Sequence, residues 1–240
     1  MIKKYYNLLV ELVSIHKDNY KMCKENEWAN IYHDSIRGIE FIETLPLNIG
    51  RWAGNYAFFY LLNRILNDVK PNTILELGLG ESSKFISRYL DNYLTNSNHL
   101  IIEHDINWKI QFLNKFNLSK KSKIQICNMI TRNIEGHFIN SYANILEVIN
   151  IKYDFYIIDG PIGSNHYSRY DIIEIATALN PEDEFIILFD DYNRTGEKNT
   201  IKKLLLMFNE KNINVYSKIF SGNKEVMILV TKKYKYLITV

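Results

Sequence analysis

The sequence predicts an α/β fold built on a Rossmann-like sheet of seven strands, mostly parallel, with helices on both faces and one antiparallel strand. Two observations lead to this prediction. From residue 73 onward, short apolar runs alternate with helical or loop stretches, which is typical of β-α-β units. Two strand patterns at 214–222 and 224–233, joined through Gly222 and Asn223, then indicate a closing hairpin that brings in the antiparallel strand.

The first 70 residues have a helical pattern, with breaks expected near Glu25 and at 45–50, where Pro46 and Gly50 interrupt it. We therefore expect a helical extension, residues 1–70, that packs on a domain spanning residues 71–240. Trp52 falls on the expected helix before the first strand, where an aromatic side chain favours a core position. The first five predicted strands are TILEL (73–77), HLIIEHD (99–105), KIQICN (123–128), YDFYIIDG (153–160) and EFIILFDD (184–191).

Composition narrows the class of protein and the expected partners. The 29 Lys and Arg residues nearly balance the 27 Asp and Glu residues, so there is no basic stripe and nucleic acid is not an expected partner. Cys23 and Cys127 are too few for a disulfide framework or a structural zinc site. The longest charge-free apolar stretch, 52–63, is too short to span a membrane. We expect a cytoplasmic protein with no transmembrane segment. Peripheral membrane contact and homo-oligomer formation are left open.

Acidic residues follow several of the predicted parallel strands. They are Glu76, Glu103, Asp159, Asp190 and Asp191. In open α/β sheets, ligands bind in the crevice beyond the carboxyl ends of the strands, so these carboxylates should face one crevice. The crevice is therefore expected to be strongly acidic.

The first strand is followed by a glycine-rich turn that opens a helix. Such a turn also starts dinucleotide-binding folds, but here Ser83 replaces the third glycine and Glu81 would repel a pyrophosphate. S-adenosylmethionine, with its sulfonium and ammonium charges, suits these carboxylates better, and Glu103 can accept hydrogen bonds from its ribose. The alternative is an ordinary turn in which a serine caps the helix. The predicted cofactor residues are Glu76, Gly78, Gly80, Glu81, Ser82, Ser83, Glu103, His104 and Asp159.

Four segments resemble a known family. ILELGLGESS, IIEHD, IIDGPIGSNHYSRYD and FDDYNRTGE together are similar to Rossmann-like class I S-adenosylmethionine-dependent methyltransferases, particularly bacterial members associated with polysaccharide synthesis. The resemblance covers the chain from about Trp52 to the C-terminus. The aspartates after the fourth and fifth strands are also similar to those of macrocin-type sugar O-methyltransferases, which bind magnesium. That resemblance implies that Asp159, Asp190 and Asp191 hold Mg²⁺, although DGPIGS departs from the family's DGD-like pattern.

Physical chemistry also supports a metal at these aspartates. Neighbouring strands lie about 4.8 Å apart, so carboxylates at their tips converge and must either share a proton or bind a cation. Hard carboxylate oxygens favour Mg²⁺, Mn²⁺ or Ca²⁺. The alternative is that Asp191 or Asn193 caps a turn while Asp190 pairs with Arg194 or Arg169.

Polar residues after Asp159 are candidates for catalysis and for acceptor binding. Asp159 or His166 can serve as a general base toward a hydroxyl group, although an exposed loop histidine without a role is an equal alternative. We assign acceptor binding to His166, Arg169, Tyr170 and Arg194, because arginine offers a bidentate fork to an anionic sugar. The arginines can equally hold acidic loop ends together.

Three functions follow as hypotheses. The first is an S-adenosylmethionine-dependent O-methyltransferase, assisted by a divalent metal, that acts on a sugar hydroxyl of a small molecule or glycan acceptor in bacterial polysaccharide synthesis. The second is an NAD(P)-dependent sugar oxidoreductase or epimerase, which Glu81 and the missing third glycine disfavour. The third is a non-catalytic scaffold that keeps the methyltransferase fold.

Overall fold

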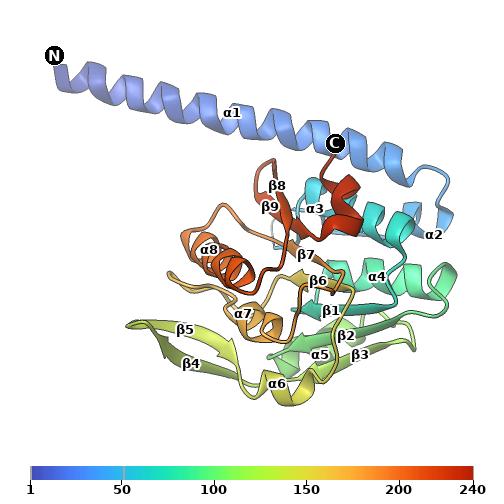
Figure 1. The fold of residues 1–240 in the computed structure, drawn as a ribbon. Coiled ribbons are helices and arrows are strands. Elements are labelled where there is room, and N and C mark those ends of the chain that lie inside the picture. Colours follow the sequence, from blue (N-terminus) through green and yellow to red (C-terminus); the bar gives the residue numbers. More distant parts are fainter. Residues whose placement is uncertain (1, 51, 240) are drawn as a thin grey trace.

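The computed structural model describes residues 2–50 and 52–239. Its main sheet has seven strands, whose bounds are β1 (Thr73–Leu77), β2 (Asn98–Glu103), β3 (Ser122–Ile126), β6 (Phe155–Ile158), β7 (Ile186–Phe189), β8 (Tyr216–Ser221) and β9 (Glu225–Val230). The spatial order is β3-β2-β1-β6-β7-β9-β8, and β9 runs antiparallel to both of its neighbours, β7 and β8 (Figure 1). The predicted seven-stranded sheet with one antiparallel strand is confirmed.

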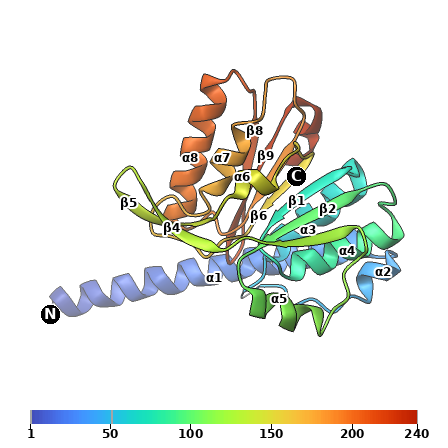
Figure 2. The same cartoon turned by 90° about the horizontal axis from the view of Figure 1, so that it is seen from below.

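Helices cover both faces of this sheet (Figures 1 and 2). Alternate residues of a buried parallel strand point to opposite faces, and they enter two separate apolar clusters: Ile74 with helices α3 and α4, and Leu75 with helices α7 and α8. The helix bounds are α2 (Glu40–Glu43), α3 (Tyr56–Arg64), α4 (Glu81–Asn92), α5 (Ile106–Leu113), α6 (Ile145–Val148), α7 (Asp171–Ala176) and α8 (Thr195–Glu210). A π-helical turn (Ile65–Val69) follows α3, and a 3₁₀ helix (Lys232–Ile238) follows β9.

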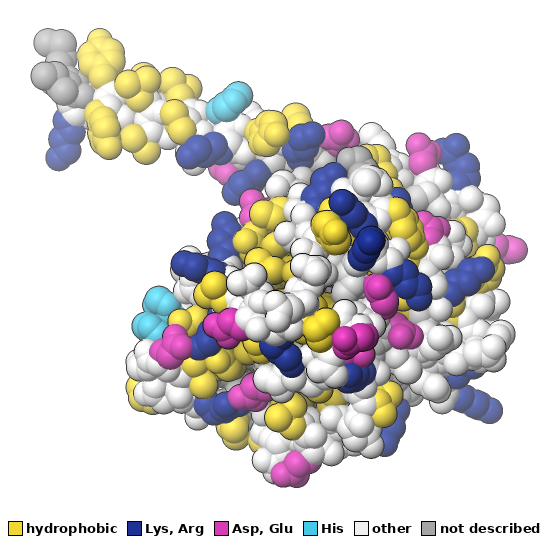
Figure 3. Space-filling view, viewed as in Figure 1, with side chains coloured by type: hydrophobic (Ala, Val, Ile, Leu, Met, Phe, Trp, Pro, Cys, Tyr) yellow, Lys and Arg dark blue, Asp and Glu magenta, His cyan; other side chains and the backbone are white. Residues whose placement is uncertain are grey.

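The N-terminal region is one long helix, α1 (Ile2–Ile36). The break predicted near Glu25 is wrong. Its carboxylate accepts hydrogen bonds from the Asn55 side chain (3.1 Å) and from the backbone N–H groups of Tyr56 and Asn223 (both 2.9 Å), so this polar residue docks the helix instead of ending it. The half of α1 before Glu25 extends past the rest of the molecule and carries exposed apolar side chains (Figure 3). The domain boundary at residue 70 stays a prediction.

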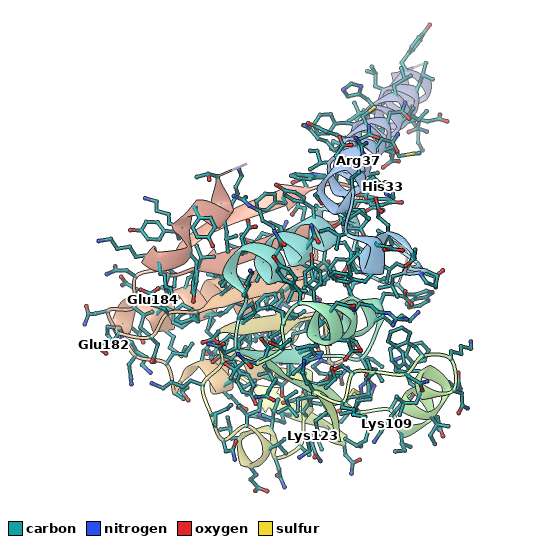
Figure 4. The ribbon with its side chains drawn as sticks, turned by 90° about the vertical axis from the view of Figure 1, so that its right-hand side faces the viewer. His33, Arg37, Lys109, Lys123, Glu182 and Glu184 are labelled. Atoms are coloured by element: carbon teal, nitrogen blue, oxygen red, sulfur yellow. The ribbon has the colours of Figure 1, made fainter. Side chains whose placement is uncertain are left out.

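The two edges of the sheet differ in what covers them. At one edge, Lys123 on β3 and Lys109 on α5 lie near each other, far from Glu182 and Glu184 (Figure 4). A charge on an edge strand discourages pairing with another chain. At the other edge, Trp28 of α1 donates a hydrogen bond from its indole Nε1 to the Ser221 carbonyl of β8 (3.0 Å). In the described part of the chain, no helix is both long and apolar enough to cross a membrane.

A second, two-stranded sheet was not expected from the sequence. It is a hairpin of β4 (Met129–Ile134) and β5 (His137–Tyr142). Its turn residues Glu135 and Gly136 both have positive φ angles (52° and 84°), as a two-residue hairpin turn of type I′ requires. The hairpin packs beside α7 through Arg132, whose guanidinium contacts Glu174 of that helix.

Candidate active site

A cavity of about 840 Å³ lies beyond the carboxyl ends of β1, β2 and β6, where ligands bind in folds of this kind. Ten of the predicted site residues line it, namely Gly78, Gly80, Glu81, Ser82, Glu103, His104, Asp159, Arg169, Asp191 and Arg194. Glu76, Ser83, His166, Tyr170 and Asp190 are not among its lining residues. The crevice is therefore where the sequence predicts it, but two of the acidic side chains, Glu76 and Asp190, lie outside it.

The turn after β1 is shaped by two glycines that approach each other. Gly78 has a φ of +102°, which side chains rarely adopt, and a β-carbon on Gly160 would lie 2.9 Å from the Gly78 nitrogen. The ends of β1 and β6 can meet only because both residues lack a side chain. Gly80 differs, because a β-carbon there would have nothing within 4 Å. Gly80 therefore leaves room on the cavity side.

Glu76 lies beneath this turn and is fully buried. Its carboxylate accepts hydrogen bonds from the hydroxyl groups of Ser82 and Ser83, the second at 2.7 Å, and lies 3.0 Å from Nε2 of His99 on β2. The Ser83 hydroxyl in turn accepts a hydrogen bond from the Gly80 N–H (3.0 Å). Glu76 and Ser83 thus fix the shape of the turn from below, and only Ser82 of the three lines the cavity.

Glu103, at the end of β2, lines the cavity although it is almost fully buried. One carboxylate oxygen accepts a hydrogen bond from the Leu79 N–H (3.0 Å), and the other accepts from the N–H groups of His104 (2.6 Å) and Asp105 (2.8 Å). Backbone donors hold the carboxylate in one orientation without neutralising it. This geometry suits acceptance of hydrogen bonds from a pair of ribose hydroxyls.

Two tryptophans at the cavity were not predicted as site residues. Trp108 donates a hydrogen bond from Nε1 to the Leu79 carbonyl (2.7 Å), and Asp105 caps its helix α5. Trp52 was expected on a helix and in the core. It lies instead in the turn before α3 and is 98% exposed. Glu81 holds the segment before α3 near the glycine turn, because its carboxylate accepts a hydrogen bond from the Asn48 N–H (3.0 Å).

The three aspartates converge as predicted, with one carboxylate oxygen from each within 4.8 Å of the others. Basic side chains reach them from three elements. Nη2 of Arg169 donates to Asp159 and to Asp191, both at 2.9 Å. Nζ of Lys224 lies 3.2 Å from Asp191 and 3.7 Å from Asp190, and Nη1 of Arg194 lies 3.0 Å from Asp191. Both arginines also lie near the buried Glu197, at 4.0 Å and 3.8 Å, so three cationic groups face four carboxylates.

The ionisation of the three aspartates follows these contacts. Burial raises the pKa of Asp159 to about 8, with Arg169 opposing the shift and the other two aspartates adding to it. Burial also raises the pKa of Asp190, whose two carboxylate oxygens have no hydrogen-bond donor. Burial acts on Asp191 as well, but Arg169, Lys224 and Arg194 together lower its pKa. Asp159 is the carboxylate best suited to accept a proton near neutral pH, since it is 25% exposed and lines the cavity.

The magnesium ion implied by the family resemblance does not fit beside these cations. Mg²⁺ binds carboxylate oxygens at about 2.0–2.1 Å in octahedral geometry, but Arg169 already contacts one carboxylate oxygen each of Asp159 and Asp191. A guanidinium group does not give up its charge in proteins. The oxygens of Asp190 accept no hydrogen bond, which favours an added cation, but Nζ of Lys224 already lies 3.7 Å from one of them. The Arg169 guanidinium thus bridges two of the three carboxylates that a divalent ion would need.

The remaining predicted residues separate into two groups. Arg194 is half exposed and lines the cavity, whereas Arg169 is buried within the aspartate cluster. The exposed ring of His166 stacks on His137 of the β4–β5 hairpin, with ring centres 3.9 Å apart, and its Nδ1 lies 3.3 Å from the Asn199 side chain. Tyr170 is buried. Arg194 is therefore the one predicted acceptor-binding residue that faces the cavity with an accessible side chain.

Comparison with solved structures identifies the fold. No protein-family model and no curated protein matches the sequence. An O-methyltransferase from Bacillus cereus in complex with S-adenosylhomocysteine matches with a TM-score of 0.54 at 14% identity, over 85% of this chain and 91% of that one. The O-methyltransferase TomG from Streptomyces achromogenes, in complex with S-adenosylmethionine, matches with a TM-score of 0.52 at 13% identity, over 84% and 89%. A putative O-methyltransferase from Klebsiella pneumoniae gives 0.52 at 13%, over 87% and 89%. The chain has the fold of class I S-adenosylmethionine-dependent methyltransferases.

Proposed function

We propose that this protein is an S-adenosylmethionine-dependent O-methyltransferase. The observation that carries the proposal is the cavity at the ends of β1, β2 and β6, where Glu103 is held by three backbone N–H groups beside an open glycine turn. In this fold, that position suits the ribose of the cofactor. The structures similar in fold include proteins bound to S-adenosylmethionine or S-adenosylhomocysteine, which supports the same cofactor here.

The residues around the cavity support transfer to a hydroxyl group. The sulfonium of the cofactor supplies an electrophilic methyl group, so the protein has to align the acceptor oxygen and remove its proton. Asp159 faces the cavity and accepts that proton, while Arg169 fixes its carboxylate from behind. With the cofactor bound, transfer would form the bond from the acceptor oxygen to the methyl carbon and break the bond from that carbon to sulfur, with S-adenosylhomocysteine as the product.

The acceptor we propose is a sugar hydroxyl of a glycan or glycoside in bacterial polysaccharide synthesis. Two apolar side chains line the cavity with large exposed fractions, Trp52 at 98% and Ile162 at 60%. The C–H face of a sugar ring packs well on an indole ring, and Arg194 can bind a carboxylate of a uronic acid in a bidentate manner. A cytoplasmic location completes the proposal, since both cysteines are free thiols.

Ligand-induced stabilisation separates this proposal from a nucleotide oxidoreductase. S-adenosylhomocysteine at 100 times its dissociation constant should stabilise the fold by about 2.7 kcal/mol and raise the melting temperature, whereas NAD⁺ should not. Methyl-radiolabelled S-adenosylmethionine is then offered with methyl glycosides, glycosiduronic acids and catechol. Label transfer to a glycoside supports the acceptor class. Stabilisation by NAD⁺ alone contradicts the proposed cofactor, and transfer only to catechol contradicts the sugar acceptor.

A further inference from the structure

The Arg169 side chain joins the ends of two neighbouring strands at the centre of the acidic cluster. Its Nη1 donates to the carbonyl groups of Ile158 at the end of β6 (3.2 Å) and Asp190 after β7 (2.8 Å). Its Nη2 donates to the carboxylates of Asp159 and Asp191 (both 2.9 Å). The residue Arg169 is only 3% exposed, so its guanidinium group interacts almost entirely with other groups of the protein.

The backbone around Arg169 is built to hold this position. Arg169 has a φ of +58° and Asp191 a φ of +57°, a region that side chains other than glycine rarely adopt. Such conformations persist where the surrounding structure fixes them. Here the preceding residue, Ser168, is fixed by three hydrogen bonds to α8: its N–H donates to Gly196, its hydroxyl donates to Glu197, and its carbonyl accepts from the Thr200 hydroxyl.

Cationic groups of the chain itself occupy the space among the carboxylates of the cluster. Arg169, Lys224 and Arg194 lie beside Asp159, Asp190 and Asp191, and both arginines also lie within 4.0 Å of the buried Glu197. A buried guanidinium cannot be neutralised by losing a proton. A divalent ion could bind only if Arg169 left, and that would break all four of its hydrogen bonds.

We infer that Arg169 takes the place of a divalent ion at the carboxyl ends of β6 and β7, so that the protein works without a metal. Arg169 is a positioning residue: it orients the Asp159 carboxylate toward the cavity and holds Asp191 against it. The catalytic consequence rests on the proposed methyl transfer, but the exclusion of metal is a property of the folded chain alone.

The test measures metal binding directly, without an acceptor. Binding of Mn²⁺ is followed by the electron paramagnetic resonance signal of the free ion, and Mg²⁺ is followed by thermal unfolding against NaCl at equal ionic strength. The proteins compared are the wild type, Arg169→Met, Arg169→Lys and, as a matched control from the same cluster, Arg194→Met. Binding of S-adenosylhomocysteine is measured on each protein to report separately on the proposed function.

We expect the wild type, Arg169→Lys and Arg194→Met to bind no Mn²⁺ at 100 µM, and Arg169→Met to gain at least tenfold in Mn²⁺ affinity with a Mg²⁺-dependent rise in melting temperature. A stoichiometric Mn²⁺ site in the wild type that Asp191→Asn removes would overturn the inference, even if Arg169→Met does not fold. A folded Arg169→Met variant without any gain in metal affinity would also overturn it. Failure to bind S-adenosylhomocysteine would contradict the proposed function and leave the metal result intact.

Discussion

Two sets of carboxylates lie at the carboxyl ends of the parallel strands, and they contact different kinds of hydrogen-bond donor. At the ends of β1 and β2, Glu76 and Glu103 accept hydrogen bonds mainly from hydroxyl and backbone N–H groups. At the ends of β6 and β7, Asp159 and Asp191 contact arginine and lysine side chains. Neutral donors leave a carboxylate its charge, whereas cations cancel it. Within the first set, Glu103 lines the cavity and therefore remains available to attract a cationic cofactor, whereas we infer that the second set binds no metal.

The first way to break this comparison is to remove the charge of Asp159, the more exposed of the two clustered aspartates that line the cavity. Asp159→Asn should lower methyl transfer by about 10²–10⁴-fold, the usual contribution of a general base. Affinity for S-adenosylhomocysteine should stay within about twofold, because Glu103 and the glycine turn hold the cofactor in our proposal. Transfer is measured with the acceptor found by radiolabelling, and affinity by calorimetry. Full transfer activity in this variant would show that Asp159 is not the base.

The second change removes a carboxylate held by neutral donors. Glu103→Ala should cost about 1.5–3 kcal/mol of cofactor affinity, which corresponds to about a 10–150-fold loss, because hydrogen bonds to a charged group are lost. Glu103→Gln is the matched variant, since it keeps the shape and one acceptor oxygen and should lose less. Calorimetry with S-adenosylhomocysteine measures both. Equal affinity in the wild type and in Glu103→Ala contradicts the ribose-binding role.

The fold was predictable because its signals are local and repeated. The central strands β1, β6 and β7 are short, mostly apolar runs, since both of their faces are buried, and the Gly222–Asn223 turn marks the antiparallel β9. The hairpin of β4 and β5 was missed because β4 is largely exposed and neither strand has a continuous apolar run. The break near Glu25 was wrongly predicted because its partners lie 30 and 198 residues away, where no sequence pattern shows them.

The position of the candidate site was predictable, but the direction of its side chains was not. Strand ends locate Glu103 and Asp159 at the cavity, whereas Glu76, one residue before the end of β1, points beneath the turn. The contact of Arg169 with Asp191 depends on how α8 holds the loop before it. Trp52 was expected in the core, because the sequence does not show that α3 begins only at Tyr56.

A smaller effect is expected from filling the open side of the glycine turn. Gly80 has an extended φ of −167°, and a β-carbon there would meet no atom within 4 Å, so Gly80→Val should fold normally. Its side chain should occupy the space where the cofactor lies and reduce affinity for S-adenosylhomocysteine by at least about tenfold, about 1.4 kcal/mol. Thermal unfolding without ligand is the control for the fold. Unchanged affinity would mean that the cofactor does not approach this turn.

The smallest effect is expected away from the cavity, at Asp171 in α7, another carboxylate that neutral donors hold. Its carboxylate is fully buried and accepts hydrogen bonds from the Ser141 hydroxyl (2.7 Å) and the Tyr142 N–H (2.9 Å), with no ion pair among its contacts in the described residues. Burial therefore raises its pKa to about 6, whereas the cations around Asp191 lower the pKa of that group. The contrast predicts how the stability of the fold changes with pH.

Because the folded pKa of Asp171 exceeds the ordinary value of about 3.9, the native state binds the proton more tightly, and stability falls as pH rises from about 4 to about 6. Between pH 5 and pH 7, this one group should cost about 1.3 kcal/mol of unfolding free energy. Asp171→Asn cannot titrate, so its stability should fall by that much less over the same interval in urea denaturation. Asp91→Asn, at an exposed position of α4, is the matched control and should follow the wild type. Identical pH dependence in Asp171→Asn and the wild type would mean that burial does not raise the pKa of Asp171. Its neutral hydrogen-bond donors would then stabilise the charged carboxylate as well as the cations stabilise that of Asp191.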